Sequence, residues 1–352
     1  MSATVGGALE RGIFVDGRAH ALEGEALTIT NPGTGELVGR AASASPEAVD
    51  AAVRSAQAAL PEWSRRGYAD RGTVLHACAQ AFADSVDDLV PLLVAEQGKT
   101  IREARIELRK AADTLEHYAG MGRDVRGVSV PGLAPGVDGR VLRRPLGVVA
   151  AIVPWNFPTT LLCNKLGPAL LCGNTVVAKP ADTTPFTTLR LAEILTEAGL
   201  PPGVVNVVPG TGPGAGEALV THRLVRKVAF TGSTPTGERV GALAAAGSKR
   251  VTLELGGSDP MIICDDADLD RAASAASMAA STTAAKPALP SSGCSCSNPW
   301  PMESSTRSRP RRPSSGSGWG PIRRARSAPC TPSATGRSCS ASSTPASRRG
   351  AR

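Results

Sequence analysis

Residues 148–158 decide the fold, and they read VVAAIVPWNFP. Six apolar residues in a row predict a strand that is buried on both faces. The prolines and aromatic residues after them predict a rigid turn at the carboxyl end of that strand, and a helical pattern over about 159–171 follows directly. A strand, a turn and a helix in this order are typical of a parallel sheet with helical crossovers.

The same alternation continues toward the C-terminus. Further strand candidates lie at 175–178, 204–208, 227–230, 251–255 and 261–264. Helical patterns lie between them at 186–198, 214–220 and 236–246. The alternation predicts an α/β fold with a doubly wound, Rossmann-like parallel sheet that helices cover on both faces. Ligands of such sheets bind at the carboxyl ends of the strands, which is where we look for chemistry.

Toward the N-terminus the chain is rich in helical patterns. Residues 45–47 (Ser-Pro-Glu) supply an N-cap, a first-turn proline and an early acid for one helix. A second pattern runs over 70–96, and a third begins at the capping box 100–103 and ends at Gly120. The five glycines within 121–144 predict loops or a hairpin.

Composition and charge divide the chain near residue 281. The formal net charge of the 352 residues is +8, but residues 282–352 hold 11 Arg and one Lys against one Glu, so the first 281 residues carry −3. The segment 282–352 also has 17 Ser and 10 Pro, with Leu289 and Ile322 as its only Leu, Ile, Val or Phe residues. It cannot bury a core, so we expect a disordered, low-complexity tail. The alternative is a basic extension that binds nucleic acid through its phosphates, although it has few aromatic residues for stacking.

Several features bear on the compartment and on metal binding. Residues 1–4 lack the basic stretch and apolar run of a signal peptide. The longest apolar stretch, 146–153, is far shorter than the roughly 20 residues that cross a bilayer. Four of the eight cysteines stand among apolar neighbours, as reduced thiols do, while Cys294 and Cys296 are too close together for the usual zinc pairs. We expect a cytoplasmic protein with no membrane partner and no metal site.

Glycine-rich turns follow two of the predicted strands. Residues 230–237, FTGSTPTG, join a strand to a helix, so backbone amides and the Ser233 hydroxyl would face an anion such as a phosphate. Residues 210–216, GTGPGAG, hold the equivalent place after the preceding strand. An ordinary βα turn is the alternative interpretation of both.

Charged residues follow another strand. Lys179 ends an apolar run, and Pro180, Ala181 and Asp182 come next. This order places a cation and a carboxylate at the edge of the sheet, where they could bind the ribose hydroxyls of a nucleotide. A solvated turn is the alternative.

Two further residues are candidates for catalysis. Glu254 stands in the apolar run 251–255, before two glycines. A buried carboxylate is costly unless it is used or paired, and a raised pKa would suit a general base. An acid that faces outward from an edge strand is the alternative. Asn156 lies in the rigid turn 154–158, where its amide could stabilise an oxyanion or cap the helix.

Together these segments resemble the aldehyde dehydrogenase superfamily, because five of them occur in the order and spacing of that family. They are 154–158, 179–182, the glycines of 210–216, 230–233 and 253–257. The resemblance covers approximately residues 12–281 and is nearest to the succinate-semialdehyde and broad aldehyde branches.

The resemblance implies an oxidoreductase that oxidises a small-molecule aldehyde to a carboxylic acid with NAD or NADP, through a cysteine thioester. Asn156 would hold the oxyanion, and Glu254 would activate the water that hydrolyses the thioester. The cofactor-binding residues that it implies are Trp155, Asn156, Lys179, Pro180, Ala181, Asp182, Gly212, Gly216, Phe230, Gly232, Ser233, Leu255 and Gly256. Asp182 stands where a glutamate is more frequent in NAD-preferring members, which leaves NAD and NADP both open.

The resemblance also implies a domain organisation. Residues 1–257 would form the NAD(P)-binding domain with a helical N-terminal part, in which 121–144 would be an oligomerisation hairpin. Residues 258–281 would begin a truncated catalytic domain. Members of the family form homo-oligomers.

The nucleophilic cysteine of the family lies in a Gly-Gln-x-Cys segment downstream of the glutamate, and the residue at that spacing here is Ala288. Read one nucleotide earlier, the codons of 284–288 permit Gly-Gln-(Thr or Ala)-Cys. We therefore expect a frameshift just before Thr282, a tail read out of frame and an inactive chain. The alternative function is a non-catalytic nucleotide-binding or interaction protein that has kept the fold.

Overall fold

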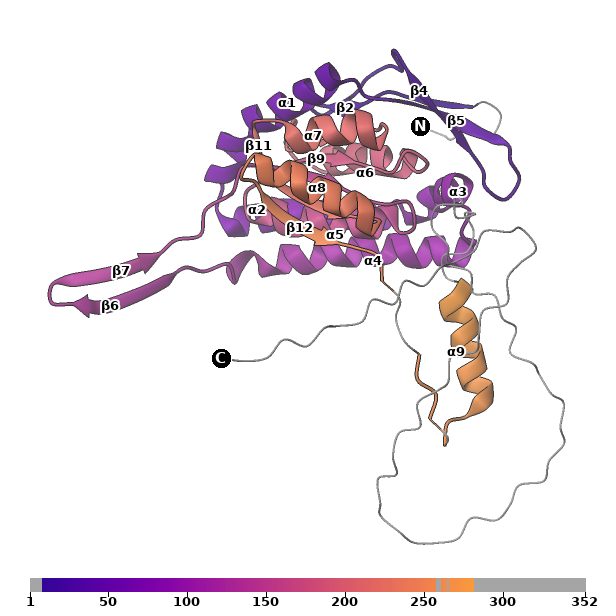
Figure 1. The fold of residues 1–352 in the computed structure, drawn as a ribbon. Helices are drawn as coiled ribbons and strands as arrows, with labels where there is room; N and C mark the ends of the chain where they lie inside the picture. The colour runs from indigo at the N-terminus through magenta and orange to yellow at the C-terminus, as the bar shows by residue number, and fades with distance from the viewer. Residues whose placement is uncertain (1–7, 258–260, 265, 282–352) are drawn as a thin grey trace, which may run out of the picture. The chain divides into compact units, whose positions relative to one another are not determined.

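The computed structural model describes residues 8–257, 261–264 and 266–281, which are coloured in Figure 1. The chain divides into two units, Met1–Cys294 and Ser295–Arg352, and all described residues belong to the first. The predicted disordered tail over 282–352 lies outside the described residues.

The described part contains strands and helices in the predicted alternation. The strands are β1 (Leu9–Arg11), β2 (Phe14–Val15), β3 (Arg18–Ala19), β4 (Ala26–Thr30), β5 (Leu37–Ala42), β6 (Val128–Ala134), β7 (Val137–Val141), β8 (Val148–Ile152), β9 (Thr175–Lys179), β10 (Val205–Val207), β11 (Val225–Thr231) and β12 (Arg250–Glu254). The helices are α1 (Pro46–Arg65), α2 (Tyr68–Asp84), α3 (Val86–Gln97), α4 (Ile101–Gly120), α5 (Pro158–Leu171), α6 (Phe186–Glu197), α7 (Glu217–Thr221), α8 (Thr234–Ala246) and α9 (Leu269–Ser281), with a 3-10 turn η1 (Met121–Arg123) and a π-helical turn η2 (Gly212–Gly216).

A seven-stranded sheet in the order β12-β11-β8-β9-β10-β2-β3 carries the fold. Its five strands from β8 to β12 are parallel, which confirms the α/β fold and the doubly wound arrangement. The hairpin of β2 and β3 extends the sheet in antiparallel fashion beside β10, which the sequence pattern did not predict. The predicted strand over 261–264 is wrong: these residues are exposed and form no strand.

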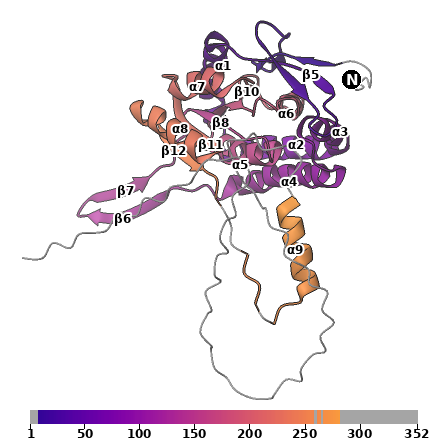
Figure 2. The same ribbon diagram turned by 45° about the vertical axis from the view of Figure 1, so that its right-hand side comes forward.

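Successive residues of β8 point to opposite faces of this sheet, and helices cover each face. Val149 and Ala151 belong to a cluster with buried side chains of α2, α4, α5 and α6. Val148 and Ala150 belong to a second cluster with those of α1, α7 and α8. Figures 1 and 2 show α4 on one side of the sheet and α7 on the other. β8 is therefore buried on both faces, as its apolar sequence predicts.

The helical pattern over 70–96 forms two helices, α2 and α3, so the prediction of one continuous helix is wrong. The break lies at Ser85, whose hydroxyl donates to the carbonyl oxygen of Ala81 at 2.8 Å. A serine that bonds back to the preceding turn offers its backbone an alternative to helix continuation. The predicted helix starts at 45–47 and 100–103 are confirmed, with the capping bonds in place.

Two segments lie outside the seven-stranded sheet. A three-stranded sheet, β1-β5-β4, packs Ile29 and Ala41 against Phe186 of α6. Residues 121–144 contain the antiparallel pair β6 and β7, which Figures 1 and 2 show as a projecting hairpin. In the described part of the chain, no helix combines the length and the apolar character that crossing a bilayer requires.

Candidate functional site

The strand order creates a crevice at the carboxyl ends of β8 and β11. The chain moves outward from β8 to β9 and β10 with α5 and α6 on one face, and then returns to β11 and β12 with α7 and α8 on the other face. β8 and β11 pair in parallel, with Ile152 opposite Phe230. A doubly wound sheet binds its ligands where the strand order reverses in this way.

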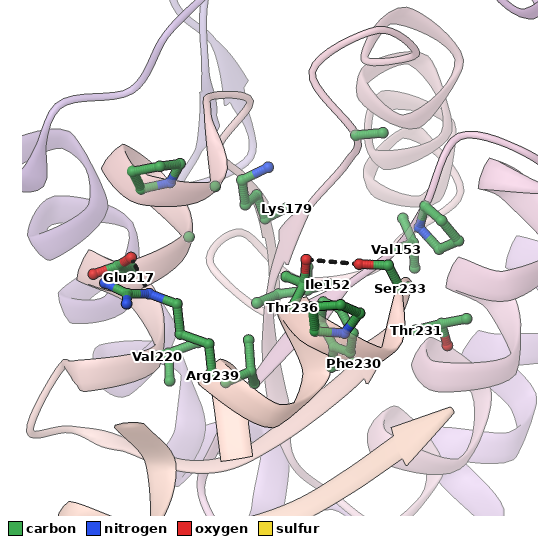
Figure 3. A pocket seen from close by; sticks show the side chains of 18 of the residues that line it. Ile152, Val153, Lys179, Glu217, Val220, Phe230, Thr231, Ser233, Thr236 and Arg239 are labelled. Carbon is green, nitrogen blue, oxygen red and sulfur yellow. Dashed lines mark hydrogen bonds and ion pairs between the residues drawn. The ribbon is translucent and has the colours of Figure 1, made fainter. Parts of the chain in front are cut away.

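A cavity of about 610 Å³ opens at this crevice (Figure 3). Eight of the predicted cofactor-binding residues line it: Lys179, Ala181, Asp182, Gly212, Gly216, Phe230, Gly232 and Ser233. The other predicted site residues are not in its lining: Trp155, Asn156, Pro180, Glu254, Leu255 and Gly256. The sheet thus brings the ends of β9 and β11 together with the turn after β10, while the remaining candidates lie around this group.

Lys179 is a buried cation in the wall of the cavity. It ends β9, is only 5% exposed and donates from Nζ to the carbonyl oxygen of Pro180 at 3.0 Å. Burial lowers the pKa of Lys179 to about 8, and the nearby carboxylate of Asp182 partly offsets this effect. Asp182 itself is exposed. A Cβ added at Gly216 would lie 3.6 Å from Lys179 Cε, so glycine keeps open the space beside the lysine.

The turn from β11 into α8 forms the polar end of the cavity. Ser233 is the N-cap residue of α8, and its hydroxyl is bonded to that of Thr236 at 2.8 Å rather than to the helix backbone. The N–H of Gly232 donates to the carbonyl oxygen of Glu254 at 3.1 Å. The N–H of Gly232 is therefore bonded to β12. The polar groups that remain to face an anion are the first turn of α8 and the bonded hydroxyls of Ser233 and Thr236.

Two buried charged residues that we did not predict, Lys99 and Glu107, hold the turn that contains Asn156 in place. Lys99 Nζ donates to the carbonyl oxygen of Asn156 at 2.9 Å, forms an ion pair with Glu107 and lies 4.5 Å from the centre of the Phe157 ring. Lys99 and Glu107 are both almost fully buried. The N–H of Phe157 donates to Asn156 Oδ1 at 3.0 Å, which orients the amide.

Glu107 continues this network into α5. Its Oε1 accepts from the N–H and the hydroxyl of Thr159, both at 3.0 Å. A carboxylate at the first turn of a helix satisfies free N–H groups and interacts favourably with the helix dipole. The signal that could have revealed Glu107 is its position on the apolar face of α4, between Ala104 and Ala111 at helical spacing.

Glu254 ends β12, opposite Thr231 of β11. Its side chain is exposed, so the expectation of a buried acid is wrong and the alternative of an outward-facing acid holds. The physical reason is the sheet order: β12 is the outermost strand on its side and alternates between half-buried and exposed residues.

Lys165 of α5 is a second residue that the sequence reasoning missed. Its Nζ donates to Thr231 Oγ1 at 2.5 Å. Burial lowers the pKa of Lys165 to about 8, and the charge of Glu254 acts in the opposite direction. A lysine as the single charged residue of the helix 158–171 was the available signal. Lys165 is thus close enough to Glu254 for the charge of the carboxylate to act on it.

The cysteines of the described residues do not supply a nucleophile to the cavity. Burial raises the pKa of the Cys78 thiol to about 12 and raises that of Cys163 further, so both thiols are protonated at neutral pH. Neither they nor Cys172 and Cys264 belong to the cavity lining. Across 8–257, 261–264 and 266–281, the structure also shows no group of three or more His, Cys, Asp or Glu side chains arranged to hold a metal.

Comparison with known proteins gives consistent results. The profile of the aldehyde dehydrogenase family matches residues 20–286. The chain is 42% identical over 252 residues to succinate-semialdehyde dehydrogenase [NADP(+)] GabD of Escherichia coli (strain K12), and the match covers 72% of this chain and 52% of that protein. The chain therefore spans about half the length of this curated relative.

Solved structures show the same likeness. One is an NADP-dependent enzyme of E. coli, with 38% identity and a TM-score of 0.76 over 80% of this chain and 58% of the other. Another is an NAD+ complex of aldehyde dehydrogenase from Bacillus cereus, with 36% identity and a TM-score of 0.74 over 77% of this chain and 56% of the other.

Proposed function

This chain belongs to the aldehyde dehydrogenase family, and from that premise we propose that it carries the cofactor-binding part of an enzyme that oxidises an aldehyde to a carboxylic acid with NAD+ or NADP+. The observation that carries the proposal is the cavity at the carboxyl ends of β9 and β11, which Lys179, Asp182 and Ser233 all line. Members of the family use NAD or NADP, and its relatives include an NADP-dependent enzyme and an NAD+ complex.

The residues around the cavity fit a dinucleotide. Its volume of about 610 Å³ is in the usual range of ligand pockets. Lys179 and Asp182 offer a donor and an acceptor to ribose hydroxyls. The Ser233 hydroxyl and the first turn of α8 offer donors to a pyrophosphate. Gly216 also lines the cavity beside the lysine.

Bound NAD+ or NADP+ would supply the hydride acceptor for the oxidation. Asn156 would stabilise the oxyanion: its Oδ1 is occupied by the Phe157 N–H, which leaves the amide NH2 group as the donor. Glu254 would accept a proton from the water that hydrolyses the thioester, and its exposed carboxylate is accessible to that water.

We also propose that a frameshift before Thr282 has removed the nucleophile, since Ala288 stands at its expected position and the alternative frame permits Gly-Gln-(Thr or Ala)-Cys there. The chain as written would then bind cofactor without oxidising an aldehyde. The alanine at this position also favours the second candidate, a nucleotide-binding protein that has no catalytic activity. The DNA sequence distinguishes a frameshifted aldehyde dehydrogenase from such a non-catalytic protein.

The domain organisation follows from the same proposal, with 1–257 as the cofactor-binding domain and 258–281 as the start of the catalytic domain. The hairpin of β6 and β7 would pair with a second copy of the chain, because Val128, Leu133 and Val141 are exposed on it.

The proposed compartment is the cytoplasm, which is consistent with the free thiols of the four cysteines in the described part of the chain.

Cofactor binding by this chain is expected to depend on pH through Lys179. Because burial lowers the pKa of Lys179 to about 8, the charged donor that it offers to the ribose hydroxyls is present below that pH and is lost above it. The Kd for NAD+, measured by calorimetry from pH 6.5 to 10, should be flat below the pKa and rise above it by up to about tenfold per pH unit. Lys179→Met should bind weakly at every pH, whereas Lys110→Met, at an exposed position of α4, should keep the wild-type profile. A flat wild-type profile would contradict the role of Lys179.

The choice between the two cofactors is expected to depend on Asp182. Its carboxylate can accept a hydrogen bond from the ribose 2′-hydroxyl of NAD+ but repels the 2′-phosphate of NADP+. We expect Asp182→Asn to raise the affinity for NADP+ relative to NAD+ by about fivefold, the effect of removing one charge near the surface. Competition binding measures this ratio, with Asp113→Asn on the exposed side of α4 as the control. An unchanged ratio would remove Asp182 from cofactor selection.

A further inference from the structure

An ion pair spans two helices in the wall of the cavity. Arg239 Nε of α8 donates to Glu217 Oε1, at the start of α7, at 2.7 Å. Both side chains belong to the cavity lining. Figure 3 shows the pair on one side of the pocket and Ser233 on the other, with Lys179 between them. The pair therefore marks the end of the cavity opposite to the anion-facing turn.

The ion pair with Glu217 positions the guanidinium of Arg239 and engages only one of its three nitrogen atoms. The bond occupies Nε, and the arginine side chain remains 65% exposed while that of Glu217 is 31% exposed. The same bond lowers the pKa of Glu217 and raises that of Arg239, so both groups stay charged at neutral pH. The side chain of Arg239 is thus accessible to a ligand in the cavity.

The surroundings of the pair are apolar. Val220 of α7 and Val240 of α8 are buried, and together with Leu243 they line the same cavity. The polar groups Ser233 and Thr236 lie one to two helical turns earlier on α8. The six residues from Ser233 to Arg239 correspond to about 9 Å along the helix axis, which leaves room for a sugar between an anion and a ring.

We propose that Arg239, held by Glu217, stacks on the purine of the bound dinucleotide, with Val220, Val240 and Leu243 against the rest of the ring. A planar guanidinium over an aromatic face is attracted by the π electrons and stacks well. Glu217 reduces the freedom that the arginine would otherwise lose on binding, so the contact is organised before the ligand arrives. This inference rests on the proposed function, because it takes the ligand to be NAD+ or NADP+. It adds a recognition residue for the adenine end.

The test uses the full 352-residue chain and measures the Kd for NAD+ and for AMP by calorimetry. Arg239→Ala should raise both values by about two- to fivefold, because AMP also carries the purine. Arg239→Tyr removes the charge and the ion pair but retains a flat face, and it should stay within about twofold of the wild type. Glu217→Gln should weaken binding less than Arg239→Ala does. Arg223→Ala, at an exposed residue outside the cavity, is the matched control and should change nothing.

The outcomes separate this inference from the proposed function. Wild-type protein that binds neither NAD+ nor AMP overturns both. Wild-type protein that binds both ligands, with Arg239→Ala unchanged, overturns the stacking role and leaves the cofactor site standing. An Arg239→Tyr variant that binds as poorly as Arg239→Ala assigns the effect to the ion pair and likewise overturns stacking. Thermal unfolding of each variant checks that the fold is retained.

Discussion

Restoring the reading frame before codon 282 is expected to yield a protein that forms NADH or NADPH from its cofactor when an aldehyde is added. In that protein, Glu254→Gln is expected to lower the steady-state rate of NADH or NADPH formation by about 10²- to 10⁴-fold. The physical reason is that the glutamine cannot accept the proton of the attacking water. The carboxylate of Glu254 is exposed at the end of β12 and lies near the cation of Lys165, so its replacement removes the base without disturbing the core.

The shape of the time course identifies the step that is lost. Because Glu254 is assigned to thioester hydrolysis, the variant should still release one equivalent of reduced cofactor in a burst and then slow down. Stopped-flow absorbance measures the burst, and Glu238→Gln, at an exposed position of α8, provides the control. A frame-restored protein that binds cofactor and never reduces it would favour the non-catalytic alternative.

Glu107→Ala is expected to destabilise the protein by about 3–5 kcal/mol, the usual cost of leaving one buried charge without its partner. Glu107 pairs with Lys99 and accepts from Thr159, so its removal strands a buried ammonium and two donors at the first turn of α5. Urea unfolding followed by fluorescence measures the loss. Asp113→Ala, at an exposed position of the same helix, should change stability by less than about 0.5 kcal/mol.

A second variant isolates the ion pair. If Lys99→Met and Glu107→Ala each remove the same interaction, the double variant should be more stable than the sum of the single effects predicts. Additive effects would show that Lys99 and Glu107 act independently, which contradicts the network described here.

The sequence predicted the sheet because its strands follow simple rules. Residues 148–153 are apolar throughout, and the structure buries β8 on both faces. The short strands β4 and β5 escaped prediction because their side chains alternate only weakly between buried and exposed positions. The break between α2 and α3 escaped because it depends on one local bond of Ser85, which a helical pattern does not reveal.

Some residues of the candidate site could be predicted from the sequence, and the contacts of others could not. Lys179, Asp182 and Ser233 could be predicted because they follow directly on strands, and parallel strands bring such positions to one edge of the sheet. The contacts of Lys99 and Lys165 could not be predicted, because each joins residues far apart along the chain: Lys99 bonds to Asn156, 57 residues away, and Lys165 to Thr231, 66 residues away. Such contacts follow from helix packing rather than from local pattern.

The most direct test is an accurate read of the source DNA across codons 276–292. We predict one additional or one missing nucleotide just before codon 282, after which the corrected frame encodes Gly-Gln-(Thr or Ala)-Cys at the place of residues 284–288. Such a result would identify the chain as the cofactor-binding half of an aldehyde dehydrogenase followed by sequence read out of frame. A read that confirms Ala288 in the written frame would contradict this account and favour a nucleotide-binding protein without the catalytic cysteine.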